Sequence, residues 1–137
     1  MNAIHACSLS AHSDDYINHV CSLLKKADIS VVICPRAMLD GVQLRNKIAH
    51  IHNSIAPIDF FLKHNINVAL GVDNIYDYFC PFADGNLLTE LNFLLETSRI
   101  YDLNLLTDIA TTNGYKIIEQ CKENPDLKVC NKISSGY

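Results

Sequence analysis

In INVALGVDNIYDYF, residues 66–79, an apolar run is followed closely by Asp73 and a group of aromatic side chains. Residues 66–71 are apolar and rich in β-branched and small side chains, and similar short runs cover residues 3–8 and 29–34. Continuous runs of this kind are typical of parallel strands buried on both faces. The sequence therefore predicts three buried parallel strands, the last of which ends close to Asp73.

A helix is predicted between the first two strands, over residues 13–28. Ser13 is placed to cap it, acidic residues occupy its first turn and lysines lie near its end, as the helix dipole favours. The apolar positions at helical spacing are Tyr16, Val20, Leu23 and Leu24.

Further helices are predicted after the second and third strands. Between these strands, an irregular loop from Arg36 to His52 leads to a helix capped by Asn53 or Ser54, with Pro57 in its first turn. Three helices follow Gly85, and the last fifteen residues are polar and expected to fray. The evidence for these helices is the leucine repeat at 87, 91, 94 and 95, a cap at Asp102 for a helix to Ala110, and the segment 113–120.

Composition restricts the class of protein. The chain has 137 residues, 49% of them hydrophobic, which is enough for the core of one domain, and its net charge of −4 leaves no basic surface for nucleic acid. The six cysteines form no Cys-x-x-Cys pair and lie mostly in apolar stretches, which indicates free thiols in a reducing, cytoplasmic environment. No signal peptide or membrane span is indicated, so we expect no membrane partner.

The alternation of strands and helices predicts an α/β fold with right-handed crossovers and a parallel sheet. In such folds, functional residues collect in the loops that follow the carboxyl ends of the strands. His5 lies in the first predicted strand, the second leads into the long loop through Arg36, and the third ends at Asp73. His5 and Asp73 could therefore face one cleft, and both are residue types that bind metals and transfer protons.

A family resemblance rests on several of these stretches. They are His5 at a strand end, ADISVVICP (27–35), IHNSIAPIDFFLKHNINVALGVDNIYDYFCPFADGN (51–86), TELNFLLETSRIYDL (89–103) and DIATTNG (108–114). Together, over roughly residues 3–120, they resemble the last three β/α units of the metal-dependent amidohydrolase superfamily, within it the cytosine deaminase-like branch. The resemblance implies that residues 1–121 are a partial (β/α)8 barrel domain, comprising strands six to eight, and that 122–137 are a polar C-terminal tail.

The resemblance also implies roles for four residues. Asp73 would bind a divalent metal, zinc or iron, and shuttle a proton between the attacking water and the leaving group, and His5 would stand beside it as a second catalytic residue. Phe79 would cover a flat heterocyclic substrate, and Asn74 would contact the substrate at a position that is acidic in the family. The implied reaction is hydrolysis of a C–N bond other than a peptide bond, such as deamination of cytosine.

Several ligands of that family's metal site have no counterpart at the expected places. They are the His-x-His pair of strand one, the histidine of strand five and, in the deaminase branch, a nearby glutamate. His50 and His52 form a His-x-His pair, but they precede Asp73 by only about twenty residues, and we interpret them as loop residues. We therefore expect this chain alone not to retain the metal.

Two hypotheses follow for the chain as a whole. In the first, it is the C-terminal part of a hydrolase whose site is completed by the remaining N-terminal barrel portion or by a self-associating copy, because three strands expose two edges and a face. In the second, it is a non-catalytic remnant or interaction module derived from the same fold.

Overall fold

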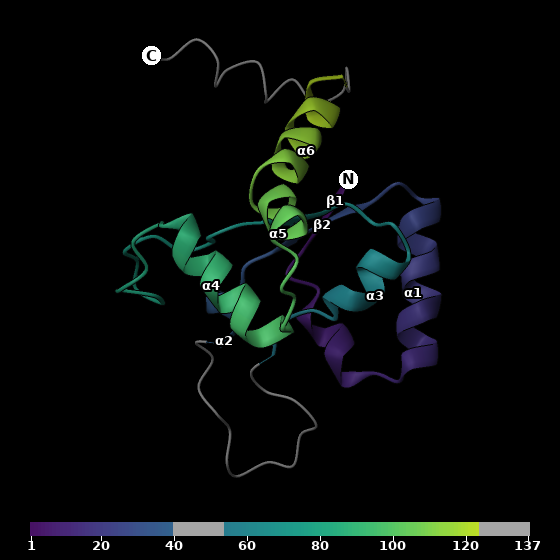
Figure 1. Ribbon diagram of the computed structural model, residues 1–137, viewed down its shortest axis with the longest axis horizontal. Coiled ribbons are helices and arrows are strands. Elements are labelled where there is room, and N and C mark those ends of the chain that lie inside the picture. The colour runs from purple at the N-terminus through teal and green to yellow at the C-terminus, as the bar shows by residue number, and fades with distance from the viewer. Residues whose placement is uncertain (40–53, 124–137) are drawn as a thin grey trace.

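A computed structural model describes residues 1–39 and 54–123 (Figure 1). Its centre is a three-stranded parallel sheet in the order β1 (Asn2–Ile4), β2 (Ser30–Ile33) and β3 (Val68–Leu70). Ala3 pairs with Val31, and Val31 pairs with Val68. The predicted α/β class and parallel pairing are confirmed, with β2 in the middle.

The helices lie around this sheet (Figure 1). Helices α1 and α3 pack together on one side of the view, and α2 and α4 pack together on the other. Helix α5 crosses close to β3, and α6 projects away from the sheet. The elements outside the sheet are the 3-10 helix η1 (Cys7–Ala11) and the helices α1 (Asp14–Lys26), α2 (Pro35–Leu39), α3 (Ile58–Lys63), α4 (Leu87–Ser98), α5 (Leu103–Ala110) and α6 (Thr112–Glu123).

Local sequence explains where three of these helices begin. The Ser13 side chain accepts a hydrogen bond from the backbone N–H of Tyr16, and Asp102 accepts from the N–H groups of Asn104 and Leu105. Asn86 caps α4 in the same way. Side-chain oxygens at these positions satisfy N–H groups that have no partner inside the helix, so both predicted caps, Ser13 and Asp102, are confirmed.

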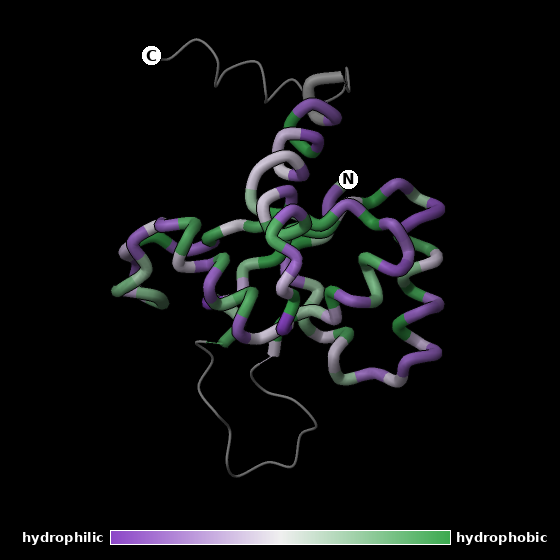
Figure 2. Tube along the Cα trace, in the orientation of Figure 1, coloured by the Kyte–Doolittle hydropathy of each residue, from purple (hydrophilic) through white to green (hydrophobic). Residues whose placement is uncertain are grey.

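One apolar cluster joins the sheet to four helices, and Figure 2 shows it as the concentration of hydrophobic residues around the strands. The alternate residues Val31 and Ile33 of β2 and Val68 and Leu70 of β3 point into it. The leucine repeat of α4 packs against this cluster, as predicted, with Leu94 fully buried. Its other buried helical members are Ile17 and Cys21 of α1, Ile58 and Phe61 of α3, and Leu106 and Ile109 of α5.

The first strand differs from its prediction over residues 3–8. It ends at Ile4, because the backbone of His5 and Ala6 is left-handed (φ 66° and 52°) and η1 begins at Cys7. It is also not buried on both faces, since Ile4 is 54% exposed. A continuous apolar run cannot distinguish a central strand from an edge strand, which explains the error.

Two helix predictions also need correction. The predicted loop from Arg36 to His52 begins with helix α2, where Pro35 occupies the first helical position. Helix α3 starts only at Ile58, after Pro57, and no side chain caps it, so the predicted cap at Ser54 is wrong. His50, His52 and Asn53 lie outside the described residues, as does the predicted tail beyond Glu123.

The buried face of α1 is rotated from the predicted one. Ile17 and Cys21 are buried, whereas Tyr16 and Leu23 are exposed and Val20 and Leu24 are half-buried. Both sets have helical spacing, and the position of α3 against α1 decides which set faces the core.

The two edges of the sheet and the face opposite the core differ in how far other parts of the chain cover them. The register directs the Val68 carbonyl away from β2, and the Asn113 side-chain amide donates to it at 2.8 Å, so α6 partly covers the β3 edge. The predicted second open edge is therefore partly closed. Ile4 pairs with Val32 on the face opposite the core, and both remain partly accessible. In residues 1–39 and 54–123, no helix combines the length and apolar character needed to cross a membrane.

Candidate functional site

The carboxyl ends of the strands bring His5 and Asp73 together. His5 directly follows β1, and Asp73 lies three residues beyond β3. The Nε2 atom of His5 is 3.7 Å from Oδ2 of Asp73 although the two strands are not neighbours in the sheet. Parallel pairing through β2 places both strand ends at one rim, so the two side chains meet there across the end of β2.

Both residues have an unusual backbone. His5 and Asp73 have φ angles of 66° and 67°, and Ala6 has 52°. The His5 N–H donates to the Val32 carbonyl at 2.8 Å, and the Ala6 N–H donates to the Ile4 carbonyl at 2.8 Å. Left-handed conformations of non-glycine residues cost about 1–3 kcal/mol each and tend to occur at functional positions, where the surrounding structure holds them.

The pair is accessible from solvent. The His5 side chain is 27% exposed and that of Asp73 is 39% exposed, whereas the Nδ1 atom of His5 is buried and has no hydrogen-bond partner among the described residues. The distance of 3.7 Å is too long for a direct hydrogen bond. Two ligand atoms that are each about 2 Å from one zinc ion lie within about 4 Å of each other. The spacing therefore allows His5 Nε2 and Asp73 Oδ2 to contact one metal ion or one small molecule between them.

A metal site needs more donors than this pair. Structural and catalytic zinc sites have three or four protein ligands. In the part of the chain that the structure describes, no group of three His, Cys, Asp or Glu side chains is placed to hold a metal ion. The described residues therefore do not form a metal site by themselves, and His5 and Asp73 can supply at most two of its donors.

Cys34 follows β2 at the same rim, between the two strand ends. It is buried, and Gly71 makes room for its thiol, since a Cβ at Gly71 would lie 3.1 Å from the Cys34 Sγ. Burial raises the pKa of this thiol to about 12, and the nearby carboxylates of Asp73 and Glu90 contribute. Cys34 is therefore a neutral thiol at neutral pH and not an activated nucleophile.

Residues 74–85, which we call the aromatic loop, are organised by Asp77. Its Oδ1 accepts hydrogen bonds from the backbone N–H groups of Phe79 at 2.9 Å and Cys80 at 2.8 Å, and the Asn74 amide donates to Oδ2. The Asn74 hydrogen bond, then that from Cys80, lowers the pKa of Asp77. Asn74, predicted to contact substrate, thus uses its amide N–H to hold the loop.

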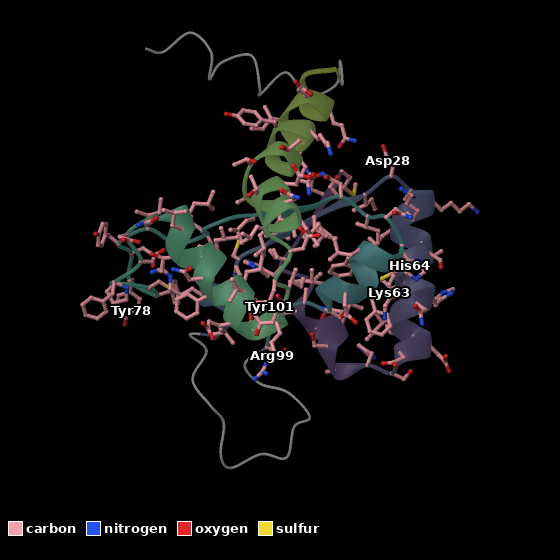
Figure 3. The ribbon with its side chains drawn as sticks, viewed as in Figure 1. Asp28, Lys63, His64, Tyr78, Arg99 and Tyr101 are labelled. Carbon is pink, nitrogen blue, oxygen red and sulfur yellow. The ribbon has the colours of Figure 1, made fainter. Side chains whose placement is uncertain are left out.

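The aromatic loop presents large side chains to solvent. Ile75, Tyr76, Tyr78, Phe79 and Phe82 are all exposed, and Tyr78 lies at the outer tip of the loop (Figure 3). Phe79, whose ring is predicted to cover a substrate, is 82% exposed as a residue. It lines an open pocket of about 310 Å³ together with Arg36, Cys80, Pro81, Phe82 and Ala83.

A buried ion pair supports this pocket. Glu90 of α4 is 0% exposed, and its Oε1 lies 2.8 Å from Nε of Arg36, whose side chain is 13% exposed. Its other oxygen, Oε2, accepts a hydrogen bond from the Arg36 backbone N–H at 3.1 Å. Asp84 of the aromatic loop approaches the same guanidinium, with Oδ1 3.8 Å from Nη2. Ion pairs thus join α2, the start of α4 and the aromatic loop.

The sequence interpretation did not assign a role to Glu90, Arg36 or Asp77. Glu90 had a detectable signal, because position 90 falls between leucines 87, 91 and 94 on the apolar face of α4, where a charge requires a partner. Arg36 follows the end of a strand, but nothing in the sequence pairs it with a residue 54 positions away. The functional roles predicted for His5, Asp73, Phe79 and Asn74 stay predictions.

Comparisons with known proteins bear on the fold alone. No family profile matches the sequence, and no curated protein matches it. Among solved structures, the chain is similar to a 5-methylcytosine deaminase from Klebsiella pneumoniae, liganded with 5-fluorocytosine, at 23% identity and a TM-score of 0.70. The match covers 82% of this chain and 28% of the deaminase chain. The small parallel sheet and its helices therefore match part of the fold of a much longer enzyme.

Proposed function

We propose that this chain contributes His5 and Asp73 to a metal-dependent hydrolase that acts on C–N bonds other than peptide bonds. The reaction we propose is hydrolytic deamination of a cyclic amidine or nucleobase such as cytosine. In this proposal β1, β2 and β3 correspond to strands six to eight of an amidohydrolase (β/α)8 barrel.

The observation that carries this proposal is the approach of His5 Nε2 to Asp73 Oδ2, 3.7 Å, at the carboxyl ends of two strands. The two residues are 68 positions apart in the sequence, and each has a left-handed backbone that turns the chain at the strand end. The partial fold match to a 5-methylcytosine deaminase supports the fold that this proposal assumes.

The two side chains suit different parts of a deamination. An ionised carboxylate at Asp73 can accept a proton from an attacking water and return it to the departing amine. The imidazole of His5 can hold the water or the carboxylate in place through Nε2. Phe79, on the loop that follows, offers a ring on which a flat substrate can lie.

The remaining donors of a metal site would have to come from outside the described residues. We propose that they belong to the rest of a barrel or to a second copy of this chain, packed against the β1 edge and the face that carries Ile4. That surface is partly apolar and accessible, whereas Asn113 partly covers the β3 edge. Zinc or iron held by His5 and Asp73 together with such additional donors would lower the pKa of a bound water toward neutrality.

A specific observation favours the alternative, a non-catalytic remnant or interaction module. The described residues bring together only two potential metal ligands, and five large apolar or aromatic side chains of the aromatic loop are exposed. Exposed apolar patches of this kind often mark contact surfaces.

The two functions can be separated on the full 137-residue chain. Zinc and iron content and ammonia release from cytosine are measured after the molecular mass in solution has been determined, for the wild type and for Asp73→Ala. The enzyme proposal expects metal and ammonia release in the wild type and loss of both in Asp73→Ala. The matched control is Asp108→Asn, which alters an exposed carboxylate on α5 and should change neither. Equal values in wild type and Asp73→Ala would refute the site, and absence of both in all assembly states would favour the remnant.

A further inference from the structure

The guanidinium of Arg36 has a carboxylate close to its Nε, whereas its Nη2 lacks an acceptor among the described residues. Glu90 Oε1 lies 2.8 Å from Nε as an ion pair, and Glu90 Oε2 accepts a hydrogen bond from the Arg36 backbone N–H. Nη2 is buried and makes no hydrogen bond within the described residues. Asp84 Oδ1 is 3.8 Å from Nη2, beyond hydrogen-bond distance. A buried charged donor without an acceptor is unfavourable, so a ligand that supplies one would bind with a gain.

The surroundings of Arg36 define what shape of ligand would fit. The pocket beside it is lined by Phe79 and Phe82, two residues of the aromatic loop that are 82% and 90% exposed. Because neither ring is fixed in the core, a flat ring of similar size can displace one of them and reach the guanidinium. A planar guanidinium with N–H donors in a fixed arrangement is suited to a flat ring that carries a hydrogen-bond acceptor.

The charges around Arg36 indicate that this acceptor is uncharged. Glu90 lies 2.8 Å and Asp84 3.8 Å from the guanidinium, so two carboxylates surround one cation. A phosphate or carboxylate entering the pocket would meet this excess negative charge. A neutral carbonyl oxygen would gain the hydrogen bond without that repulsion.

We propose that Arg36 is a specificity-determining residue, whose Nη2 donates to a carbonyl oxygen of a flat, uncharged heterocycle bound in the pocket that Phe79 and Phe82 line. This inference rests on the proposed function for the class of substrate, and it adds the group that recognises the substrate. A ring with the carbonyl binds more tightly than the same ring without it, and an anionic ring binds more weakly.

The test is an NMR titration of the ¹⁵N-labelled full chain with two neutral probes and one anionic probe. Cytosine carries a ring carbonyl, 4-aminopyrimidine is the same ring without it, and orotate carries a carboxylate. We expect cytosine to bind at least about tenfold more tightly than 4-aminopyrimidine, the typical effect of one hydrogen bond to a charged group. We also expect orotate to bind more weakly than cytosine.

Variants assign the difference to Arg36. Arg36→Met should reduce the ratio of the two affinities to near one. Because this change leaves Glu90 buried without its partner, the double variant Arg36→Met with Glu90→Gln gives the same readout without an unpaired charge. The matched control is Phe82→Leu, which should weaken both neutral probes equally and leave their ratio unchanged.

Several outcomes would overturn the inference. They are equal binding of cytosine and 4-aminopyrimidine, a ratio that survives in both Arg36 variants, tighter binding of orotate, or no binding of any probe. Failure of the proposed function gives a different result. In that case no ammonia is released, while the affinity ratio persists in the wild type and in Asp73→Asn and disappears in the Arg36 variants. Ammonia release with an unchanged ratio in the Arg36 variants would refute the inference alone.

Discussion

The ion pair between Arg36 and Glu90 allows a quantitative prediction about stability. Glu90 is 0% exposed, and Arg36 meets it both through Nε at 2.8 Å and through the backbone N–H at 3.1 Å. Removal of one partner from a buried pair leaves a charge without compensation, which costs about 3–5 kcal/mol. We therefore expect Arg36→Met to lower the free energy of unfolding by about 3–5 kcal/mol. With a urea m-value of about 2 kcal/mol/M, the unfolding midpoint falls by about 2 M.

The assay is urea unfolding followed by circular dichroism, with an exposed ion pair as control. Lys63 and Asp59 lie 3.7 Å apart at positions i and i+4 of α3, with side chains 69% and 62% exposed. Such pairs contribute about 0–1 kcal/mol, so Lys63→Met should shift the midpoint by less than about 0.5 M. Addition of Glu90→Gln to Arg36→Met should recover most of the loss. If the two single variants had equal midpoints, or if the double variant were no more stable than Arg36→Met, the reasoning would be wrong.

Three further predictions concern the rim of the sheet. Asp77→Ala removes the acceptor of the Phe79 N–H, so hydrogen exchange at that amide should accelerate while exchange in α4 stays the same. The Asn74 amide and backbone N–H groups lower the pKa of Asp77. In the wild type, protection of the Phe79 amide against exchange should therefore be complete above the ordinary carboxyl pKa of about 4 and should be lost as the pH falls through the lowered pKa. Constant protection of this amide in acid would contradict the prediction. Gly71→Ala places a Cβ 3.1 Å from the Cys34 Sγ and should lower the free energy of unfolding by about 1–3 kcal/mol. Adding Cys34→Ala should recover part of this loss. An unchanged urea midpoint in Gly71→Ala would count against this contact. Burial raises the pKa of the Cys34 thiol to about 12. In the native chain, Cys34 should therefore react with iodoacetamide at about pH 8 more slowly than the half-buried Cys7. In urea the two rates should be similar, and peptide mass spectrometry measures both. Equal native rates would show that Cys34 is accessible.

Sequence patterns brought His5 and Asp73 to one rim of the predicted sheet, although they extended the first strand beyond its end at Ile4. The apolar run before Asp73 indicates a strand, and parallel topology then directs its end to the same rim as His5. The sequence could not predict the backbone conformation that turns the chain at each strand end. The apolar pattern continues past Ile4, but the left-handed backbone of His5 and Ala6 ends β1 there. The partner of Glu90 could not be predicted from the sequence either, because residues 54 positions apart meet only through the packing of α4 against α2.

Local sequence patterns were sufficient to predict the helix starts at Ser13 and Asp102, the parallel α/β class and the place of Asp73 after the last strand. These features depend on interactions within a few residues or on the period of apolar side chains, both of which are present in the chain before it folds. Only the tertiary structure decided that Ile17 and Cys21, not Tyr16 and Leu23, face the core. It also decided that Nε2 of His5 comes within 3.7 Å of Asp73 and that a buried carboxylate fixes Arg36 beside the aromatic loop. The physical reason is that packing selects among several faces and partners of equal local quality, and that selection depends on contacts between residues far apart in the chain.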